Sequence, residues 1–265
     1  MSSQLHAAFE KAKSENRAAL IAYIPAGFPT VEKGFEIIDA IIEGGADIVE
    51  VGWPYSDPLM DGPTIQKAAE MALANGATAK DVMSTAARVK SAGAVPLVMS
   101  YWNPIERYGV EKFSQELSSA GGVGVITPDL TPEEAEAWIS ATDKVGVQRI
   151  FLVAPSSRDD RLQIVANATT GFVYAASLMG VTGTRESVSN HAETLVARTR
   201  NVTELPIAVG LGVSTPAQAS DIAKYADGVI VGSAFVKAVL DAPNHAEAIK
   251  AVKTLATDLR KGCAK

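Results

Sequence analysis

One glutamate stands inside a run of residues that otherwise has the character of a buried strand. Glu50 lies in the run D-I-V-E-V, flanked by the β-branched residues Ile48, Val49 and Val51. A strand that is apolar on both faces is typical of a parallel sheet covered on both sides. An ionised carboxylate is costly there, so we expect Glu50 to have a raised pKa or a dedicated partner. Either outcome would suit an acid–base catalyst, and the alternative is a structural carboxylate in an internal salt bridge.

The loop that follows this strand supplies two further carboxylates. It reads V-G-W-P-Y-S-D-P-L-M-D-G-P-T-I-Q and contains Asp57 and Asp61. Two carboxylates in different environments allow one site to hold an acid and a base together. Both also have structural explanations, because Asp61 could cap the helix predicted to begin at Pro63, and Asp57-Pro58 is a turn former.

The strand-like segments lack the other common catalytic groups. No lysine lies in them or at their C-terminal ends, so a Schiff-base mechanism has no nucleophile. His6, His191 and His245 are scattered through predicted helices, which predicts no metal site. A substrate whose bond is cleaved by carboxylates alone must itself stabilise the released electrons. An aromatic leaving group that can be protonated on carbon would do so.

Eight short apolar runs are predicted to be strands, and most are separated by 20 to 35 residues with one amphipathic helical pattern. This alternation predicts a single α/β domain over residues 1–265, a (β/α)₈ TIM barrel with extra helices. An open doubly wound sheet is the alternative, but no G-x-G-x-x-G follows the first run. The predicted strands are Leu20–Ile24, Ile48–Val51, Pro96–Tyr101, Val123–Thr127, Arg149–Val153, Gly171–Ala175, Pro206–Val209 and Gly228–Val231.

Helix boundaries are also marked in the sequence. The longest gap between predicted strands should hold two helices broken at Asn75-Gly76. Thr131-Pro132-Glu133-Glu134 and Ser214-Thr215-Pro216 both have the pattern of a capped helix with proline at its first position.

The last three predicted strands end in glycines. These clusters are Gly180–Thr184, Gly210–Ser214 and Gly232-Ser233. Barrels often bind phosphate with the loops after strands seven and eight and with a helix N-terminus. Only Arg185 lies near these clusters as a cation, so we expect backbone amides to bind the phosphate. Any single cluster could merely be a turn.

The whole-chain composition excludes several classes of protein. The 265 residues are 47% hydrophobic and 20% charged, which is ordinary for a globular protein. A net charge of −6 argues against a nucleic-acid-binding protein. The single cysteine, Cys263, cannot form an internal disulfide and fits a reducing compartment. No signal peptide or membrane span is visible, so we expect a cytoplasmic protein with no membrane partner.

Several motifs in order along the chain resemble one family, the alpha subunit of tryptophan synthase. The most specific match is E-V-G-W-P-Y-S-D-P-L-M-D-G-P-T-I-Q, from Glu50 to Gln66. The resemblance covers essentially the whole chain. The further matches are P-A-G-F-P (Pro25–Pro29), Y-W-N-P (Tyr101–Pro104), P-D-L-T-P-E-E (Pro128–Glu134), G-V-T-G (Gly180–Gly183), V-G-L-G-V-S (Val209–Ser214) and V-G-S-A (Val231–Ala234).

The resemblance implies a retro-aldol cleavage of indole-3-glycerol phosphate to indole and glyceraldehyde 3-phosphate. By position, Glu50 would transfer protons, Asp61 would bind the indole N–H, and Tyr174 would orient Glu50 or the substrate. The phosphate would be held by Gly183, Gly212, Gly232 and Ser233. The indole pocket would be lined by Tyr23, Ile65, Met99, Tyr101 and Leu211. For Tyr23, Tyr101 and Tyr174, ordinary packing in the barrel is the alternative.

The resemblance also implies a beta-subunit partner in an alpha2beta2 hetero-tetramer. That partner would hold pyridoxal phosphate, so this chain is expected to bind no cofactor itself. Asp57, Asn103 and Asp129 are expected to meet the partner. Trp53 and Leu211 depart from the residues usual in the family, which puts the shape of the pocket in doubt. A free-standing lyase with the same site and a non-catalytic barrel that binds a phosphorylated ligand remain the alternatives.

Overall fold

The computed structural model describes residues 4–176, 185–210 and 212–265, and its strands form one parallel sheet. Along this sheet the strand order is β5-β4-β3-β2-β1-β9-β8-β7-β6. The strands are β1 (Ala19–Pro25), β2 (Ile48–Gly52), β3 (Val95–Met99), β4 (Gly124–Ile126), β5 (Gln148–Ile150), β6 (Leu152–Val153), β7 (Val173–Ala176), β8 (Ile207–Gly210) and β9 (Gly228–Val231).

The two ends of this strand order are joined through a single residue. Only Phe151 separates β5 from β6, and β5 pairs with β4 while β6 pairs with β7. One bent strand therefore bridges both edges, and the sheet closes on itself. The predicted (β/α)₈ TIM barrel is confirmed, and the open doubly wound sheet is wrong. All eight predicted strands are present, the fifth being divided at Phe151.

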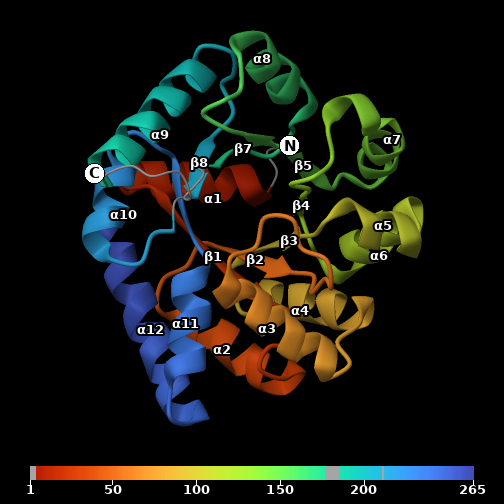
Figure 1. Ribbon diagram of the computed structural model, residues 1–265, viewed down its shortest axis with the longest axis vertical. Helices are drawn as coiled ribbons and strands as arrows, with labels where there is room; N and C mark the ends of the chain where they lie inside the picture. The colour runs from red at the N-terminus through yellow and green to blue at the C-terminus, as the bar shows by residue number, and fades with distance from the viewer. Residues whose placement is uncertain (1–3, 177–184, 211) are drawn as a thin grey trace.

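Helices surround the strands in the described parts of the chain (Figure 1). They are α1 (Gln4–Ser14), α2 (Val31–Glu43), α3 (Pro63–Ala74), α4 (Ala79–Ser91), α5 (Trp102–Tyr108), α6 (Val110–Ala120), the 3₁₀ turn η1 (Pro132–Glu134), α7 (Glu136–Val145), α8 (Asp159–Ala168), α9 (Arg185–Arg200), α10 (Pro216–Ala223), α11 (Ser233–Asp241) and α12 (His245–Gly262). None of the described helices is long and apolar enough to cross a membrane.

The helix boundaries follow the predicted signals with one exception. α3 ends and α4 begins on either side of Asn75-Gly76, as expected. At α10, Thr215 and Gln218 form the expected capping box. Thr131, in contrast, makes no side-chain cap, and a 3₁₀ turn precedes α7 there. That prediction was wrong because the chain turns again at Ala135 before the α-helix starts.

The core consists of two hydrophobic layers. The outer layer lies between the strands and the surrounding helices. The inner layer fills the barrel and includes Leu5, Phe9 and Ala12 of α1, so this helix closes one end of the barrel. In Figure 1, α1 lies inside the ring of outer helices rather than in it. With one end closed in this way, a substrate site is expected at the other end, where the strands terminate.

Candidate active site

Glu50 lies inside the barrel in the middle of β2. In the strand register it pairs with Tyr23 of β1 and Leu97 of β3. Leu97 belongs to the inner hydrophobic layer, and only 2% of Glu50 is exposed. Because side chains alternate along a strand, Glu50 and Gly52 face inward, while Val51 faces the helices. The sequence prediction of a buried carboxylate is confirmed.

The environment of Glu50 favours its neutral form. Burial raises the pKa of Glu50 from an ordinary value of 4.5 to about 8. Among the described residues no cation pairs with it, and its Oε1 atom has no hydrogen-bond partner. The structural alternative of an internal salt bridge therefore finds no support. At neutral pH, Glu50 holds a proton that it can donate, as a general acid requires.

Asp47, at the N-terminal end of β2, is paired with a cation, in contrast to Glu50. Asp47 accepts hydrogen bonds from the Arg17 guanidinium at 2.6 and 2.7 Å and from the Leu20 N–H at 2.9 Å. This pair is fully satisfied and joins the beginnings of the two strands. Asp47 thus forms a structural ion pair at the N-terminal end of the strands. Glu50, three residues later, is unpaired among the described residues and can carry a proton in the barrel interior. In barrels, the strand ends that carry chemistry are the C-terminal ones.

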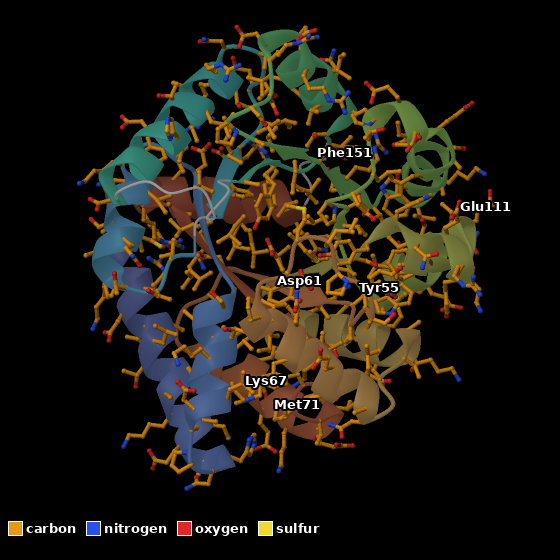
Figure 2. All side chains as sticks on the ribbon, viewed as in Figure 1. Tyr55, Asp61, Lys67, Met71, Glu111 and Phe151 are labelled. Atoms are coloured by element: carbon orange, nitrogen blue, oxygen red, sulfur yellow. The ribbon has the colours of Figure 1, made fainter. Side chains whose placement is uncertain are left out.

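Asp61 lies in the loop between β2 and α3, at residues 53–62. Its Oδ1 atom accepts a hydrogen bond of 2.9 Å from the Tyr101 hydroxyl. Burial raises the pKa of Asp61, and the hydrogen bond from Tyr101 partly offsets that rise. The helix cap of α3 is Gly62, without a side-chain bond, so Asp61 is not the cap. Figure 2 shows Asp61 near the middle of the molecule, with Tyr55 farther out.

Tyr23 and Tyr174 complete a cluster of ionisable groups around Glu50. Burial, then the charges of Asp61 and Glu50, raise the pKa of Tyr23 well above its usual range, and Tyr101 and Tyr174 contribute further. Burial and then the charge of Glu50 raise the pKa of Tyr174 as well. Both phenols therefore stay protonated and can donate hydrogen bonds. Tyr23 thus lies within electrostatic reach of Glu50, Asp61, Tyr101 and Tyr174. Tyr174 is also within reach of Glu50, and Tyr101 is within reach of Asp61.

Two glycines make room for the tyrosine hydroxyls, and the sequence analysis did not identify this role. A Cβ at Gly52 would lie 2.3 Å from the Tyr23 hydroxyl oxygen. A Cβ at Gly210 would lie 2.4 Å from the Tyr174 hydroxyl oxygen. In both cases the glycine stands two residues beyond the register partner of the tyrosine. The sequence pattern that could have indicated this role is a tyrosine and a glycine near the C-terminal ends of two neighbouring strands.

The other residues predicted to line the pocket occupy different layers. Met99 ends β3 and packs against the inner hydrophobic layer, as does Tyr174. Ile65 is in the first turn of α3, partly buried against the outer layer. Leu211 lies outside the described residues. Contact of these side chains with a substrate stays a prediction.

The predicted phosphate site is described in part. Ser233 begins α11, and Gly232 is the helix N-cap. A Cβ at Gly232 would lie 3.4 Å from Cβ of Tyr23, which places the N-terminus of α11 beside Tyr23. Gly212 has a φ of 65°, a conformation that favours glycine. The first N–H groups of a helix lack partners within the helix and can bind an anion. Gly183 lies outside the described residues.

Trp53, whose departure from the usual family residue left the shape of the pocket open, points away from Glu50. Its ring stacks on Phe113 with centroids 5.4 Å apart and meets Tyr108 edge-on at 5.9 Å. Since Glu50 faces inward, the residue three positions later on the same extended chain faces the helices. Trp53 therefore packs between the β2 end and α6, and its size does not shape the barrel interior.

The residues predicted to meet a partner share one region of the surface. Asp57, Asn103 and Asp129 are all exposed. Asn103 donates a hydrogen bond of 2.8 Å to the Tyr55 hydroxyl, and Asp129 accepts one of 2.9 Å from the Trp102 N–H. A hollow of about 470 Å³ is lined here by Trp53, Pro54, Tyr55, Ser56, Leu73, Asn103, Pro104, Arg107 and Tyr108.

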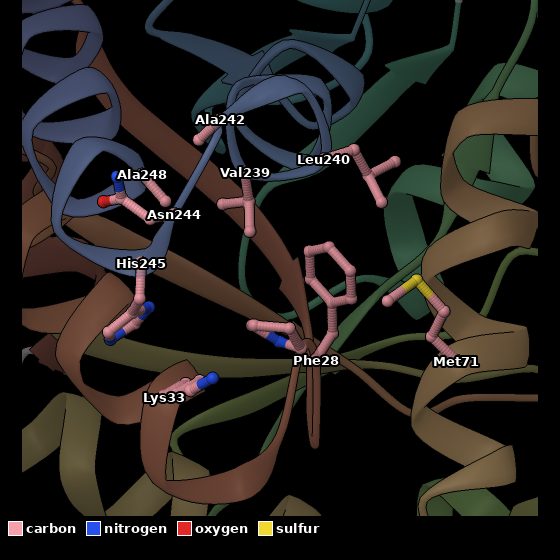
Figure 3. Close-up of a pocket in the computed structure, with 10 residues that line it drawn as sticks. Phe28, Lys33, Met71, Val239, Leu240, Ala242, Asn244, His245 and Ala248 are labelled. Carbon is pink, nitrogen blue, oxygen red and sulfur yellow. The ribbon is translucent and has the colours of Figure 1, made fainter.

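A second hollow lies outside the barrel, between α2, α3, α11 and α12. Its volume is about 210 Å³, and Phe28, Met71 and Leu240 form its apolar side (Figure 3). It contains none of the predicted site residues. Within the described ranges, no three His, Cys, Asp or Glu side chains form a group that could hold a metal ion.

Comparison with known proteins identifies relatives over nearly the whole chain. The profile of the family described as Tryptophan synthase alpha chain matches residues 9–264. The tryptophan synthase alpha chain of Thermobifida fusca is 58% identical over 255 residues, which cover 95% of this chain and 94% of the relative. That of Streptomyces coelicolor is 58% identical over 252 residues, covering 95% and 93% of the two chains.

Solved structures agree with this result. A chain of tryptophan synthase from M. tuberculosis, in its aminoacrylate-bound form, matches with a TM-score of 0.90 and 45% identity, covering 98% of this chain and 99% of that one. Tryptophan synthase subunit alpha from Legionella pneumophila matches with a TM-score of 0.90 and 31% identity, covering 99% of both chains.

Proposed function

Because the chain belongs to the tryptophan synthase alpha chain family, we propose that it cleaves indole-3-glycerol phosphate to indole and glyceraldehyde 3-phosphate. Membership makes the chain a lyase of tryptophan biosynthesis. The observation that carries the specific reaction is the buried Glu50, whose pKa burial raises to about 8 and which lies within electrostatic reach of Tyr23 and Tyr174. Such a group can both give and take a proton near neutral pH.

Glu50 acts twice in the proposed reaction. Its proton first goes to the indole ring carbon that bears the glycerol chain, which converts the aromatic ring to a protonated, cationic indolenine. The resulting carboxylate then takes the proton of the neighbouring hydroxyl on the glycerol chain. The carbon–carbon bond breaks as that hydroxyl becomes an aldehyde, and the bond electrons return to the ring. Indole leaves, and Glu50 is protonated again.

Asp61 stabilises the positive charge that develops on the ring nitrogen. When the ring carbon is protonated, the nitrogen becomes cationic, and a nearby carboxylate lowers the energy of that state. Desolvation strengthens this effect because the interaction takes place in a partly buried site. Tyr174, protonated and influenced by the charge of Glu50, orients the Glu50 carboxyl group or the substrate.

The ends of the last two strands suit the phosphate of the substrate. We assign phosphate binding to Gly183, Gly212, Gly232 and Ser233, with the N-terminus of α11 supplying N–H donors. The overall charge of −6 repels an anion, so local donors must provide the attraction. The apolar side chains assigned to the indole ring are those of Tyr23, Ile65, Met99, Tyr101 and Leu211.

The reaction product passes to a beta subunit, which holds the pyridoxal phosphate, in an alpha2beta2 assembly. The proposed contact surface contains Asp57, Asn103 and Asp129. The loop between β2 and α3 also exposes Leu59 by 76% and Met60 by 48%, which is unusual for large apolar side chains. A partner that covers this loop would bury them and restrict the segment that carries Asp61.

Incubation of the pure chain with indole-3-glycerol phosphate tests the reaction directly. We expect indole and glyceraldehyde 3-phosphate in equal amounts, with activity falling above pH 8 as Glu50 loses its proton. Absence of indole from the folded chain, with and without a beta subunit, would reject the proposal.

A pair of surface variants tests the partner. Leu59→Ser should weaken the activation of indole release by a cognate beta subunit, whereas Ile164→Ser on α8, 43% exposed, should not. Light scattering of the mixture should give a mass of two alpha and two beta chains. Equal activation of both variants would place the contact elsewhere.

A further inference from the structure

The hydroxyl of Tyr101 connects the end of β3 to the loop that carries Asp61. It donates a hydrogen bond to Asp61 Oδ1 at 2.9 Å and accepts one from the Met60 N–H at 3.0 Å. Tyr101 follows β3 directly as the N-cap residue of α5, and only 2% of it is exposed. One oxygen atom of a buried residue therefore contacts two successive residues of the loop between β2 and α3.

The direction of both hydrogen bonds is determined by the chemistry of the groups. A backbone N–H can only donate, so the Tyr101 oxygen must accept from Met60. The single phenolic proton is then free to point at Asp61, whose Oδ1 must be the acceptor. A carboxylate that accepts this bond is favoured in its ionised form. Its other oxygen accepts no hydrogen bond from the described residues and can take a further donor.

The ring of Tyr101 is held from several sides. Its face meets the ring of Tyr55, with centroids 5.5 Å apart, and Tyr55 in turn is bonded to Asn103. The Ser100 N–H donates to the Ile126 carbonyl at 3.1 Å, and the Ser100 hydroxyl donates to the Tyr101 carbonyl at 2.8 Å. The phenol is thus a fixed point on the barrel, whereas Asp61 belongs to a loop.

We propose that Tyr101 is a positioning residue, whose hydroxyl holds the Asp61 carboxylate ionised and aimed at the substrate nitrogen. This inference rests on the function proposed above. It gives Tyr101 a role beyond lining the indole pocket, because the ring alone would be sufficient for apolar contact with indole, whereas the hydroxyl is needed to bind Asp61. Preorganised groups act strongly because they need no reorganisation during the reaction.

Removal of the hydroxyl should impair catalysis more than binding. Tyr101→Phe keeps the ring but deletes both hydrogen bonds. A hydrogen bond to a charged group has a strength that corresponds to a fall in kcat of about 10- to 100-fold. KM should change much less, since the ring still contacts the substrate. Tyr225→Phe, in the turn between α10 and β9 that leads into the N-terminal end of β9, also deletes one tyrosine hydroxyl and is the control, which should keep full activity.

The pH dependence of kcat on the acid side distinguishes a positioning role of Tyr101 from a merely structural one, which would leave this dependence unchanged. Loss of the donated proton removes the interaction that lowers the pKa of Asp61, so that pKa rises in Tyr101→Phe. The acid limb of kcat should therefore move to higher pH. The other ionisable group that interacts with Asp61 is Tyr23, which in turn interacts with Glu50 and Tyr174, and all three are unchanged in the variant. In an Asp61→Asn background, Tyr101→Phe should cause little further loss.

Titration of the Asp61 carboxyl carbon by NMR tests the same contact without any activity. A higher Asp61 pKa in Tyr101→Phe than in the parent chain is the expected result, and identical titrations would overturn the proposal. A shifted pKa with unchanged kcat would overturn the positioning role. If the parent chain makes no indole, the proposed function fails, while the titration still decides whether Tyr101 holds Asp61 ionised.

Discussion

Replacement of Glu50 by glutamine should have two effects: it should abolish activity, and it should increase the free energy of unfolding at neutral pH. Glutamine has nearly the same size and cannot transfer the proton, so indole formation should fall by roughly 10²–10⁴-fold or more. The stability effect follows from the burial of Glu50 without a partner among the described residues. Its pKa is about 8 in the fold and 4.5 when exposed, so the folded chain holds a proton that the unfolded chain has lost.

The sign and size of the effect follow from this difference. Between pH 4.5 and 8 the folded state binds more protons, and stability falls as the pH rises. Relative to acidic pH, the raised pKa of Glu50 lowers the stability of the fold by about 3 kcal/mol at pH 7 and by about 5 kcal/mol above pH 9, where the buried group is itself ionised. Glutamine does not titrate, so the variant escapes this cost. At pH 5 the two side chains are both neutral in the fold, and the proteins should differ little.

Urea unfolding of both proteins from pH 5 to pH 9 measures the difference. All other ionisable groups are common to both chains, so their contributions cancel. The stability of Glu50→Gln relative to the parent should increase steadily with pH and then level off. Glu204→Gln, at an exposed position, is the control and should show no such trend. A difference that stays constant across this range would mean that Glu50 is ionised in the fold, which would refute the reasoning.

Four other predictions concern the same end of the barrel. Asp61→Asn should keep the melting temperature of the parent, because Gly62 rather than Asp61 caps α3, and should lose most activity. A fully active variant would remove Asp61 from the mechanism. Gly212→Val should raise KM severely in a folded protein, since a β-branched residue resists a φ of 65°, and an unchanged KM would move the phosphate site. Gly52→Ala should destabilise the fold by about 1–3 kcal/mol in thermal unfolding, because its methyl group would lie too close to the Tyr23 hydroxyl. Indole formation should survive a chelator, and should survive borohydride added with substrate; loss under either treatment would show a metal or an imine.

Two acidic residues on one strand region show how position decides the role of a carboxylate. Asp47 meets Arg17 where β1 and β2 begin, and the pair is bidentate. Glu50, only three residues later, has no cation among the described residues and rises in pKa instead. Both are costly to bury, but only the unpaired one retains a proton that can be transferred near neutral pH.

The sequence alone determined the number of strands, the burial of Glu50 and the family. Eight apolar runs at regular spacing predicted eight parallel strands, and each was found. A glutamate among β-branched residues predicted a buried carboxylate, and it was 2% exposed. These features depend on residues that are neighbours in the chain, so the local pattern is sufficient to predict them.

Only the tertiary structure decided which side chains meet. The closure of the barrel at Phe151, the bond between Tyr101 and Asp61, and the glycines that accommodate two tyrosine hydroxyls were not predicted. The sequence left open whether Trp53 alters the pocket, and the structure shows its ring stacked on Phe113 on the outer side of the barrel. Each of these contacts depends on the register between strands that lie far apart in the sequence. A shift of one residue turns every side chain of a strand to its other face, and a local pattern leaves that register open.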